Sequence, residues 1–498
     1  MDPFEYLEMR GHFNMNPGLE RMEKVLRRFG DPHLSIPAVH VGGTNGKGST
    51  SAIIQGIMGQ FPIRTGLYTS PHLISVLERL KINGADIDRS SLGAAMSKVL
   101  EVKLEDELTY FELLTAASFL LMDEMGIDLN ISEVGMGGRL DATNVLEPQA
   151  IGITSISMDH MDHLGDDPIS ITAEKCGIIK PSTPVVVGEV CTLLEERERC
   201  LRTILDHCTH NGCPVVLMSG KEEVSNKIRL LSSFNIPDWR IISVEAETGF
   251  PGTTAHFEVV RPGENGQMEP KFSLLDEVLM GEFRIPLVGP HQAYNTGIGI
   301  ALSLLVLPFA LSHSKLRGGD TNALSSLISG CMEGITKDYT CTGLREIVSA
   351  GLEKVQIRGR MERVSEDGKV YYIDGGHNIE AARSISTTIR TLHPKSRIVL
   401  LLAMMGDKEV SDFLVNLNLD LSSLVLTSLP YDRSMKPREL LEGVVRSGLF
   451  SGNVHIRPHI ESAVELWKRS IGNDEIGLAT GSFYIYPFIG NSSKDQNV

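Results

Sequence analysis

The sequence predicts an α/β protein of two domains: a larger N-terminal domain with a doubly wound, mostly parallel sheet, and a smaller, Rossmann-like C-terminal domain. Short runs rich in valine, isoleucine and leucine recur along the chain, and each precedes a glycine-rich or polar turn and a helix-like segment. They are residues 37–41, 130–134, 150–156, 184–188, 370–374, 397–403, 423–428 and 476–481. Continuous apolar strands that alternate with helices are typical of a parallel sheet covered on both faces.

The domain boundary is expected between about residues 310 and 350. A length of 498 residues allows two to four domains. The stretch 312–326, which contains Gly, Ser and Asn, separates two apolar blocks and is typical of a linker or insertion. We therefore expect one domain over 1–310, a linker over 311–350 and a second domain over 351–498. The pattern of residues 220–285 is mixed and predicts no clear element order.

Composition favours a soluble, cytoplasmic protein, which we expect to be a monomer. The formal net charge is −16, which argues against non-specific binding of nucleic acid or of an anionic membrane. The seven cysteines are an odd number without C-x-x-C spacing, as expected for reduced thiols. We see no signal peptide, and the longest apolar run, residues 298–311, is shorter than the roughly 20 residues that span a bilayer.

The strongest local motif is HVGGTNGKGST at residues 40–50. It follows an apolar strand and precedes a helix-like segment, which is the context of a phosphate-binding loop. Glycines allow the backbone to approach phosphate oxygens, and the amides at the helix N-terminus bind anions. Lys47 would neutralise phosphate charge, and the Ser49 hydroxyl is placed to bind Mg²⁺. The predicted nucleotide-binding residues are Gly43, Thr44, Asn45, Gly46, Lys47, Gly48, Ser49 and Thr50.

Polar residues at the ends of two other predicted strands suggest a metal site beside this loop. Glu133 ends one strand, and His160 lies just beyond another. Because the carboxyl ends of parallel strands meet at one crevice, both side chains could join Ser49 there. Two oxygen ligands and one imidazole suit Mg²⁺ or Mn²⁺ bridging nucleotide phosphates. By contrast, DHCTHNGC at residues 206–213 lacks zinc-finger spacing and is expected to be a helix end.

The motifs together resemble the folylpolyglutamate synthase/dihydrofolate synthase family of the Mur ligase superfamily. They occur in the family's order over most of the chain, at residues 40–51, 69–84, 108–119, 132–146, 155–165, 171–181, 289–302, 373–385 and 481–485. The resemblance implies that residues 1–310 bind ATP, that residues 351–498 are the glutamate-ligase domain, and that the active site lies in the cleft between them. Within this set, residues 70–79 resemble the family's pterin-side loop, where the sequence assigns no individual contact.

The resemblance also implies a reaction and a set of residue roles. ATP would phosphorylate a carboxylate, and the amine of L-glutamate would attack the acyl phosphate, releasing ADP and phosphate. The small-molecule substrates would be ATP, L-glutamate and a pteroate or folate acceptor. Ser49 and Glu133 would hold the ATP-linked Mg²⁺, and His160 would hold a second metal ion, together with Lys175 if that lysine is carbamylated.

Further residues are carried over from the resemblance to the nucleotide and glutamate sites. Asn295 would hold the adenine, and Arg360 would reach ATP from the second domain, although Ile357 and Arg358 replace the usual Trp-Pro. Asp374 and His377 would meet ATP and glutamate, and Ser482 would lie near glutamate. With Lys47 and Lys175, Asp374 and His377 make up the predicted catalytic set.

Two alternatives stay open. One is a Mur-type or other cofactor amino-acid ligase, although only 39 residues precede His40, too few for the extra domain of the cell-wall enzymes. The other is a phosphate-loop NTPase that acts as a switch without ligation, which the motifs at 291–295 and 374–377 disfavour. Sequence does not choose between dihydropteroate and tetrahydrofolate polyglutamates as acceptor.

Overall fold

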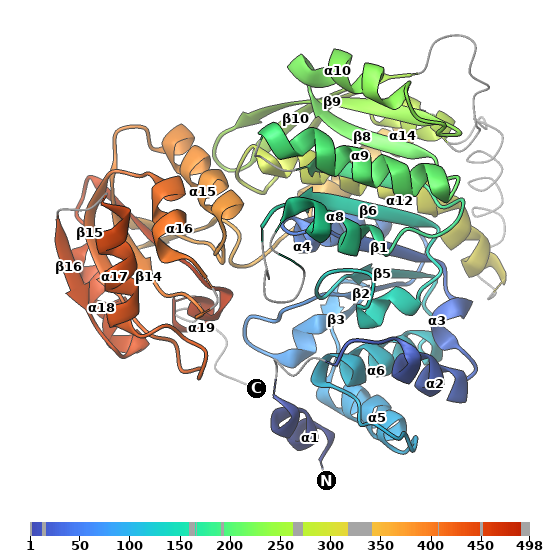
Figure 1. Ribbon diagram of the computed structural model, residues 1–498, viewed down its shortest axis with the longest axis horizontal. Helices are drawn as coiled ribbons and strands as arrows, with labels where there is room; N and C mark the ends of the chain where they lie inside the picture. The colour runs from blue at the N-terminus through green and yellow to red at the C-terminus, as the bar shows by residue number, and fades with distance from the viewer. Residues whose placement is uncertain are drawn as a thin grey trace.

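A computed structural model describes residues 2–11, 16–158, 165, 167–190, 194–261, 272–316, 341–406, 408–448 and 452–489. It has two lobes, each with a central sheet between helices (Figure 1). The predicted two-domain α/β architecture is therefore confirmed. His160 and residues 263–270 and 317–340 lie outside the described residues.

The N-terminal domain is built on an 11-stranded sheet with the order β11-β10-β9-β8-β7-β6-β1-β5-β2-β3-β4. The middle of the sheet is parallel, from β9 through β1 to β2, and both edges are antiparallel. The strands are β1 (Ala38–Gly42), β2 (Thr65–Tyr68), β3 (Leu80–Ile82), β4 (Ala85–Asp86), β5 (Leu129–Glu133), β6 (Ala150–Ile156), β7 (Val185–Val190), β8 (Val215–Gly220), β9 (Trp239–Thr248), β10 (Thr253–Val260) and β11 (Gly281–Ile285).

Helices cover both faces of this sheet. The largest hydrophobic cluster joins one face to α4 (Lys47–Met58), α11 (Ser273–Val278), α12 (His291–Leu316) and α14 (Cys341–Glu353). Two further clusters lie on the other face. They involve α1 (Pro3–Arg10), α2 (Glu20–Arg28), α3 (Pro32–Ser35), α5 (Arg89–Leu100), α6 (Tyr110–Glu124), α8 (Pro168–Cys176), α9 (Leu194–His210) and α10 (Val224–Leu231), with the short 3₁₀ turns η1 (Val76–Arg79), η2 (Ala142–Val145) and η3 (Lys221–Glu223) between strands and helices.

The C-terminal domain has a six-stranded sheet with the order β12-β13-β17-β14-β15-β16, parallel except for β12. Its strands are β12 (Glu362–Glu366), β13 (Lys369–Ile373), β14 (Arg397–Leu402), β15 (Leu421–Leu426), β16 (Asn453–Ile456) and β17 (Glu475–Thr480). One face packs on α15 (Ile379–Leu392), α16 (Val410–Leu417) and α17 (Pro437–Ser447), and the other on α18 (Ile460–Ser470), η5 (Phe483–Ile485) and α19 (Tyr486–Ile489).

The passage between the domains comes later than the predicted 310–350 boundary. Helix α12 runs to Leu316 and includes Pro308, so residues 311–316 are helical and not linker. Helix α14 places Leu344, Val348 and Leu352 in the core of the N-terminal domain, where it packs against α4. The apolar spacing of α14 does not reveal which helix it packs on, because that helix, α4, lies about 300 residues earlier in the chain.

Helix α12 is also the one helix in the described ranges that is long and apolar enough to cross a membrane by length and composition. In the fold it packs on α4 and on the strands β6 and β7, and 78% of its most apolar window is buried. A helix that is apolar on all sides is expected at the centre of a large domain. Its hydrophobicity is thus accounted for by core packing.

The cysteine-rich segment at 206–213 is a helix end, as predicted, because α9 ends at His210. Cys208 and Cys213 are fully buried in a hydrophobic cluster, and the Nδ1 atom of His207 lies 2.8 Å from the Thr203 carbonyl oxygen on the same helix. Burial raises the pKa of both thiols, as expected for unreactive cysteines. The described residues contain no group of three or more His, Cys, Asp and Glu side chains that could hold a metal ion.

Candidate active site

The phosphate loop lies at the centre of the large sheet. It joins β1, which pairs in parallel with β5 on one side and with β6 on the other, to the N-terminus of α4. This position is the switch point at which ligands bind in open α/β sheets. The loop is tied to the end of β6: the Thr44 amide donates to the Ser155 carbonyl oxygen at 2.8 Å, and the Asn45 amide donates to the Ser155 hydroxyl at 2.9 Å. The loop is therefore held in shape before any ligand binds.

Gly46 is required where the loop meets α12. It has a φ of 87°, and a Cβ atom at this position would lie 2.4 Å from Oδ1 of Asn295. Asn295 is buried, and its amide nitrogen donates to Gln292 Oε1 at 3.0 Å, which orients the side chain against the loop. The predicted adenine-side asparagine thus contacts the predicted phosphate loop directly.

Two lysines converge on one carbonyl oxygen of this loop. Lys47 Nζ donates to the Gly43 and Thr44 carbonyl oxygens at 3.1 and 3.0 Å, and Lys175 Nζ, from α8, donates to the Gly43 oxygen at 3.1 Å. Lys175 is 4% exposed, so it is not the surface charge that its position on a helix would suggest. Two cations within reach of one oxygen make a site suited to an anion.

Glu133, at the end of β5, faces the N-terminus of α4. A Cβ atom on Gly48 would lie 3.6 Å from its Oε2, and the same oxygen accepts the Ser70 amide at 3.1 Å. Burial raises the pKa of Glu133, and the cations Lys47, Arg360 and Arg79 oppose the shift. A buried carboxylate at the start of the helix that carries the buried Ser49 hydroxyl fits a hard divalent cation, which prefers oxygen ligands.

The C-terminal domain contributes Arg360, Asp374 and His377. The oxygens of Asp374 accept the backbone amides of Gly376 and Met361 at 2.7 and 2.8 Å, which fixes the carboxylate at the end of β13. Burial raises its pKa, with Arg360 as the main opposing charge. Burial lowers the pKa of Arg360, while Asp374 and Glu133 both oppose that shift. Arg360 is thus close enough to interact electrostatically with carboxylates of both domains. His377 is oriented by the Gly375 carbonyl oxygen, 3.0 Å from its Nδ1.

Phe483 is a site residue that sequence reasoning missed. The guanidinium of Arg360 lies over its ring, 4.2 Å from the centroid, and the ring of His377 meets it edge-on at 6.4 Å. A Cβ atom on Gly375 would lie 2.1 Å from Phe483 Cδ1. The neighbouring Ser482, predicted near glutamate, uses its hydroxyl to accept the Tyr484 amide at 3.3 Å, so its role toward substrate stays a prediction. No local signal marked Phe483, because its partners come from distant segments.

Two polar contacts join the domains at the phosphate loop. Asn45 and Asn378 exchange amide hydrogen bonds of 3.2 and 3.1 Å, and Asn378 also accepts the Ala381 amide as the N-cap of α15. The second contact joins His291, at the start of α12, to α15: its Nδ1 lies 2.6 Å from the hydroxyl of Ser384. Burial, with a contribution from Arg360, lowers the pKa of His291 to about 4, so this histidine is neutral at physiological pH.

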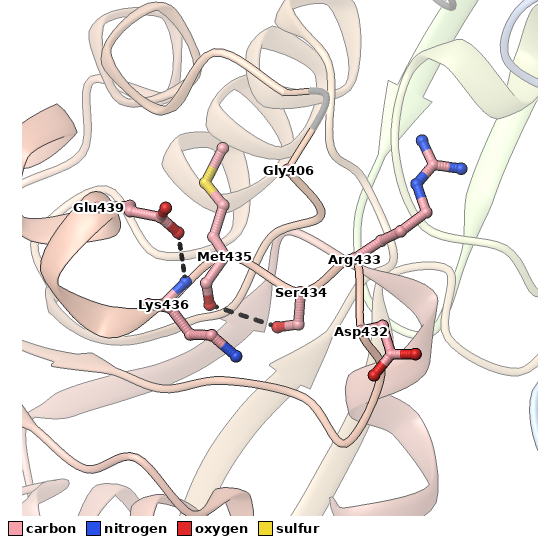
Figure 2. A pocket seen from close by; sticks show the side chains of 7 residues that line it. All are labelled: Gly406, Asp432, Arg433, Ser434, Met435, Lys436 and Glu439. Atoms are coloured by element: carbon pink, nitrogen blue, oxygen red, sulfur yellow. Dashed lines mark hydrogen bonds between the residues drawn. The ribbon is translucent and has the colours of Figure 1, made fainter.

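A pocket of about 440 Å³ lies at the carboxyl edge of the second sheet, and the sequence did not indicate it. Gly406 and residues 432–436 and 439 line it. Figure 2 shows the Ser434 hydroxyl bonded to the Met435 carbonyl oxygen and the Glu439 carboxylate bonded to the Lys436 amide, while the Arg433 side chain extends away from them. Burial raises the pKa of Tyr484, and Arg79, Tyr431 and Arg433 lie close enough to act on it. Tyr431, which precedes the lining residues, contacts Tyr484 with 4.6 Å between the ring centroids, so this segment packs against the residues that follow β17.

Comparisons with known proteins agree with this geometry. The chain matches the Mur ligase middle domain over residues 41–303 and the Mur ligase glutamate ligase domain over residues 359–483. It is 38% identical over 482 residues to the dihydrofolate synthase/folylpolyglutamate synthase of Escherichia coli, covering 96% of this chain and 92% of that protein.

Solved structures share the fold. A folylpolyglutamate synthase of Mycobacterium tuberculosis complexed with ADP and AMPPCP has a TM-score of 0.74 at 23% identity, covering 99% of this chain and 100% of that one. A bifunctional folylpolyglutamate synthase/dihydrofolate synthase with Mn, AMPPNP and L-glutamate bound has a TM-score of 0.69 at 23% identity, covering 97% and 96%.

Proposed function

This chain belongs to the dihydrofolate synthase/folylpolyglutamate synthase family of Mur ligases, and from that premise we propose that it adds L-glutamate to a folate-type acceptor at the expense of ATP. The observation that supports the proposal best is the meeting of a phosphate loop from one domain with Arg360, Asp374 and His377 from the other. Arg360 interacts electrostatically with both Asp374 and Glu133, so residues of the two domains form one charged site. A switch NTPase has no need of this second set.

The chain's residues supply positioning and charge for phosphoryl transfer. Lys47 leaves the loop carbonyls to neutralise the nucleotide's phosphates, and Arg360 adds a second cation from the other domain. The acceptor's carboxylate attacks the terminal phosphate, ADP leaves, and the acyl phosphate forms. The amine of glutamate then attacks the acyl carbon, and phosphate leaves with the electron pair of the broken C–O bond. Holding three reactants in line makes the largest contribution expected of such a site.

Asp374 and His377 are placed to receive the incoming amino acid. The Asp374 carboxylate is fixed by two backbone amides, which suits it to orient an ammonium group. The Gly375 carbonyl oxygen, 3.0 Å from Nδ1 of His377, orients the imidazole ring of this residue. We assign these residues to amine positioning, while Ser482 shapes the turn that carries Phe483.

Glu133 and the Ser49 hydroxyl would hold the ATP-linked divalent cation, and His160 a second one. A bound Mg²⁺ supplies charge neutralisation at the phosphate oxygens. Burial already raises the pKa of Glu133, so a cation at this carboxylate would relieve an unfavourable charge. A similar protein was solved with Mn, AMPPNP and L-glutamate bound, which supports a metal-dependent reaction here.

We propose that Lys175 is carbamylated. As an ammonium it competes with Lys47 for the Gly43 oxygen; as a carbamate it would be an anion near the nucleotide's metal. Intact-mass measurement in bicarbonate buffer tests this proposal, because a carbamate adds the mass of CO₂. An unmodified mass together with full activity of Lys175→Arg would contradict it.

A ligation assay tests the function. Purified protein with ATP, Mg²⁺ and L-glutamate should release ADP only when dihydropteroate or tetrahydrofolate is also present, and the two acceptors tell the synthase activities apart. Glutamate-independent ATP hydrolysis at the same rate would contradict ligation and favour the switch alternative. Size-exclusion chromatography tests our proposal of a monomer, and cell fractionation tests the cytoplasmic compartment.

A further inference from the structure

Arg79 is a buried cation that forms no ion pair with a carboxylate of the described residues. It ends η1 and is 7% exposed. Its Nε donates to His72 Nδ1 at 2.9 Å, and its guanidinium lies 5.3 Å from the centroid of the Tyr110 ring. Within the described ranges, neither Nη atom donates to a protein acceptor and no carboxylate is within ion-pair distance. Neither Nη atom is among the sealed polar atoms of the described residues that lack a partner.

Another buried arginine in the same domain shows what such a group ordinarily requires. Arg240 is 1% exposed, and its guanidinium contacts Asp238 at 2.6 Å and Asp276 at 2.8 Å. Burying a guanidinium is costly unless its donors are satisfied. Arg240 thus has two carboxylate partners, whereas the Nε of Arg79 donates to a histidine and its Nη atoms donate to no acceptor among the described residues. A ligand with a planar pair of acceptor oxygens, such as a carboxylate, would satisfy both Nη atoms at once.

Arg79 faces the reaction site. Its loop begins at the end of β2, and the Ser70 amide of that loop binds Glu133. At the other side, Leu73 packs against the hydrophobic cluster of the second domain. Burial raises the pKa of both Glu133 and Tyr484, and Arg79 acts against both shifts. The free donors therefore lie between Glu133, near the nucleotide, and Tyr484 of the second domain.

We propose that Arg79 binds the carboxylate of the acceptor that does not react. This inference rests on the proposed glutamate ligation. A folate acceptor ends in a glutamate with two carboxylates, of which one becomes the new amide and the other stays anionic. Dihydropteroate has a single carboxylate, and that group reacts. Arg79 thus distinguishes folylglutamate acceptors from dihydropteroate and forms no covalent bond. It projects from the domain that carries the phosphate loop, which favours the acceptor over the incoming glutamate.

The test compares acceptors in Arg79→Met, which keeps the side-chain volume, Arg79→Lys, which keeps the charge, and the control Arg397→Gln, an exposed arginine of the second domain. Arg79→Met should raise KM for tetrahydrofolate by about 10- to 100-fold, the range of a charge-assisted contact, and change KM for dihydropteroate and glutamate by less than about twofold. Arg79→Lys should recover part of the loss, and Arg397→Gln should match wild type.

Other outcomes overturn the inference. An increase in KM for glutamate alone assigns the site to the amino acid, and equal losses with both acceptors remove the role in discrimination. Without ligand, Arg79→Met should unfold at the same or a higher temperature than wild type, so a clear decrease would make Arg79 structural. Calorimetric binding of folic acid and pteroic acid repeats the comparison without turnover. Absence of ligation in wild type would contradict the proposed function, while the binding ratio would still decide on Arg79.

Discussion

Replacing Phe483 tests whether an aromatic face holds Arg360 in the active site. The Arg360 guanidinium lies 4.2 Å from the ring centroid and is partly exposed. Such cation–π contacts contribute about 0.5–1 kcal/mol at exposed sites and about 2 kcal/mol when desolvated. We take about 1 kcal/mol, which corresponds to a roughly fivefold decrease in kcat/KM for ATP. Phe483→Leu removes the aromatic face but keeps apolar volume, and Phe483→Tyr keeps the face.

The assay is steady-state ligation with ATP varied and both other substrates saturating. Phe483→Leu should show the fivefold decrease with little change in the thermal midpoint, because the ring is only partly buried. Phe483→Tyr should stay within twofold of wild type. Gly375→Ala gives a second route to the same contact, since its Cβ would lie 2.1 Å from the ring. Its effect should not add to that of Phe483→Leu. Equal activity of the Leu and Tyr variants would refute this account of how Arg360 is positioned.

Three further changes probe the rest of the site. Glu133→Gln should abolish ligation yet raise the thermal midpoint of unfolding at neutral pH in the absence of nucleotide. The pKa of Glu133 is raised in the folded state, so the folded protein binds this proton more tightly than the unfolded chain does. The ionised carboxylate therefore destabilises the fold above the ordinary pKa of 4.5, and the neutral glutamine removes that cost. A lower midpoint would contradict this. Gly46→Ala should weaken calorimetric AMPPNP binding by at least about tenfold, from the left-handed strain and the clash with Asn295; unchanged affinity would exclude the clash. Asn378→Asp keeps the N-cap of α15 but cannot donate a hydrogen bond to Asn45, so kcat should fall while the stability of the fold is unchanged. Asn378→Ala also removes the cap, so its free energy of unfolding, measured in urea, should be lower by about 1 kcal/mol. Identical behaviour of the two variants would exclude a role of the amide pair in turnover.

Local sequence was enough to predict the parts of the site that local backbone builds. The phosphate loop needs a buried strand, glycines and a helix start within about 20 residues, and all are contiguous from Ala38 to Met58. Glu133 was predictable because strand ends of a parallel sheet meet at one edge. The strands near 150–156 and 397–403 were predicted within one residue, since fully buried strands consist of continuous apolar residues.

The parts that were missed depend on contacts between distant segments. Phe483 lies more than 100 residues from Arg360 and His377, and its role exists only once β13 and β17 pair. Helix α14 carries an ordinary amphipathic pattern that does not say which domain it covers. Asn378 stands beside a recognised motif, yet its bond to Asn45 spans 333 positions and joins two domains. Hydrophobic periodicity indicates that one face of a helix or strand is buried, but it does not identify the element that packs against that face.

The global charge of −16 conceals a site of the opposite sign. Lys47, Arg360 and Arg79 act on the buried carboxylate of Glu133, and Arg360 also acts on Asp374, while burial makes each of those carboxylates harder to ionise. Within the described residues these cations also contact loop carbonyls and an aromatic face. The negative charge of a nucleoside triphosphate and of a substrate carboxylate would therefore be stabilised at this site. Because these interactions are short-range and partly buried, salt should weaken them far less than it weakens steering at the acidic surface.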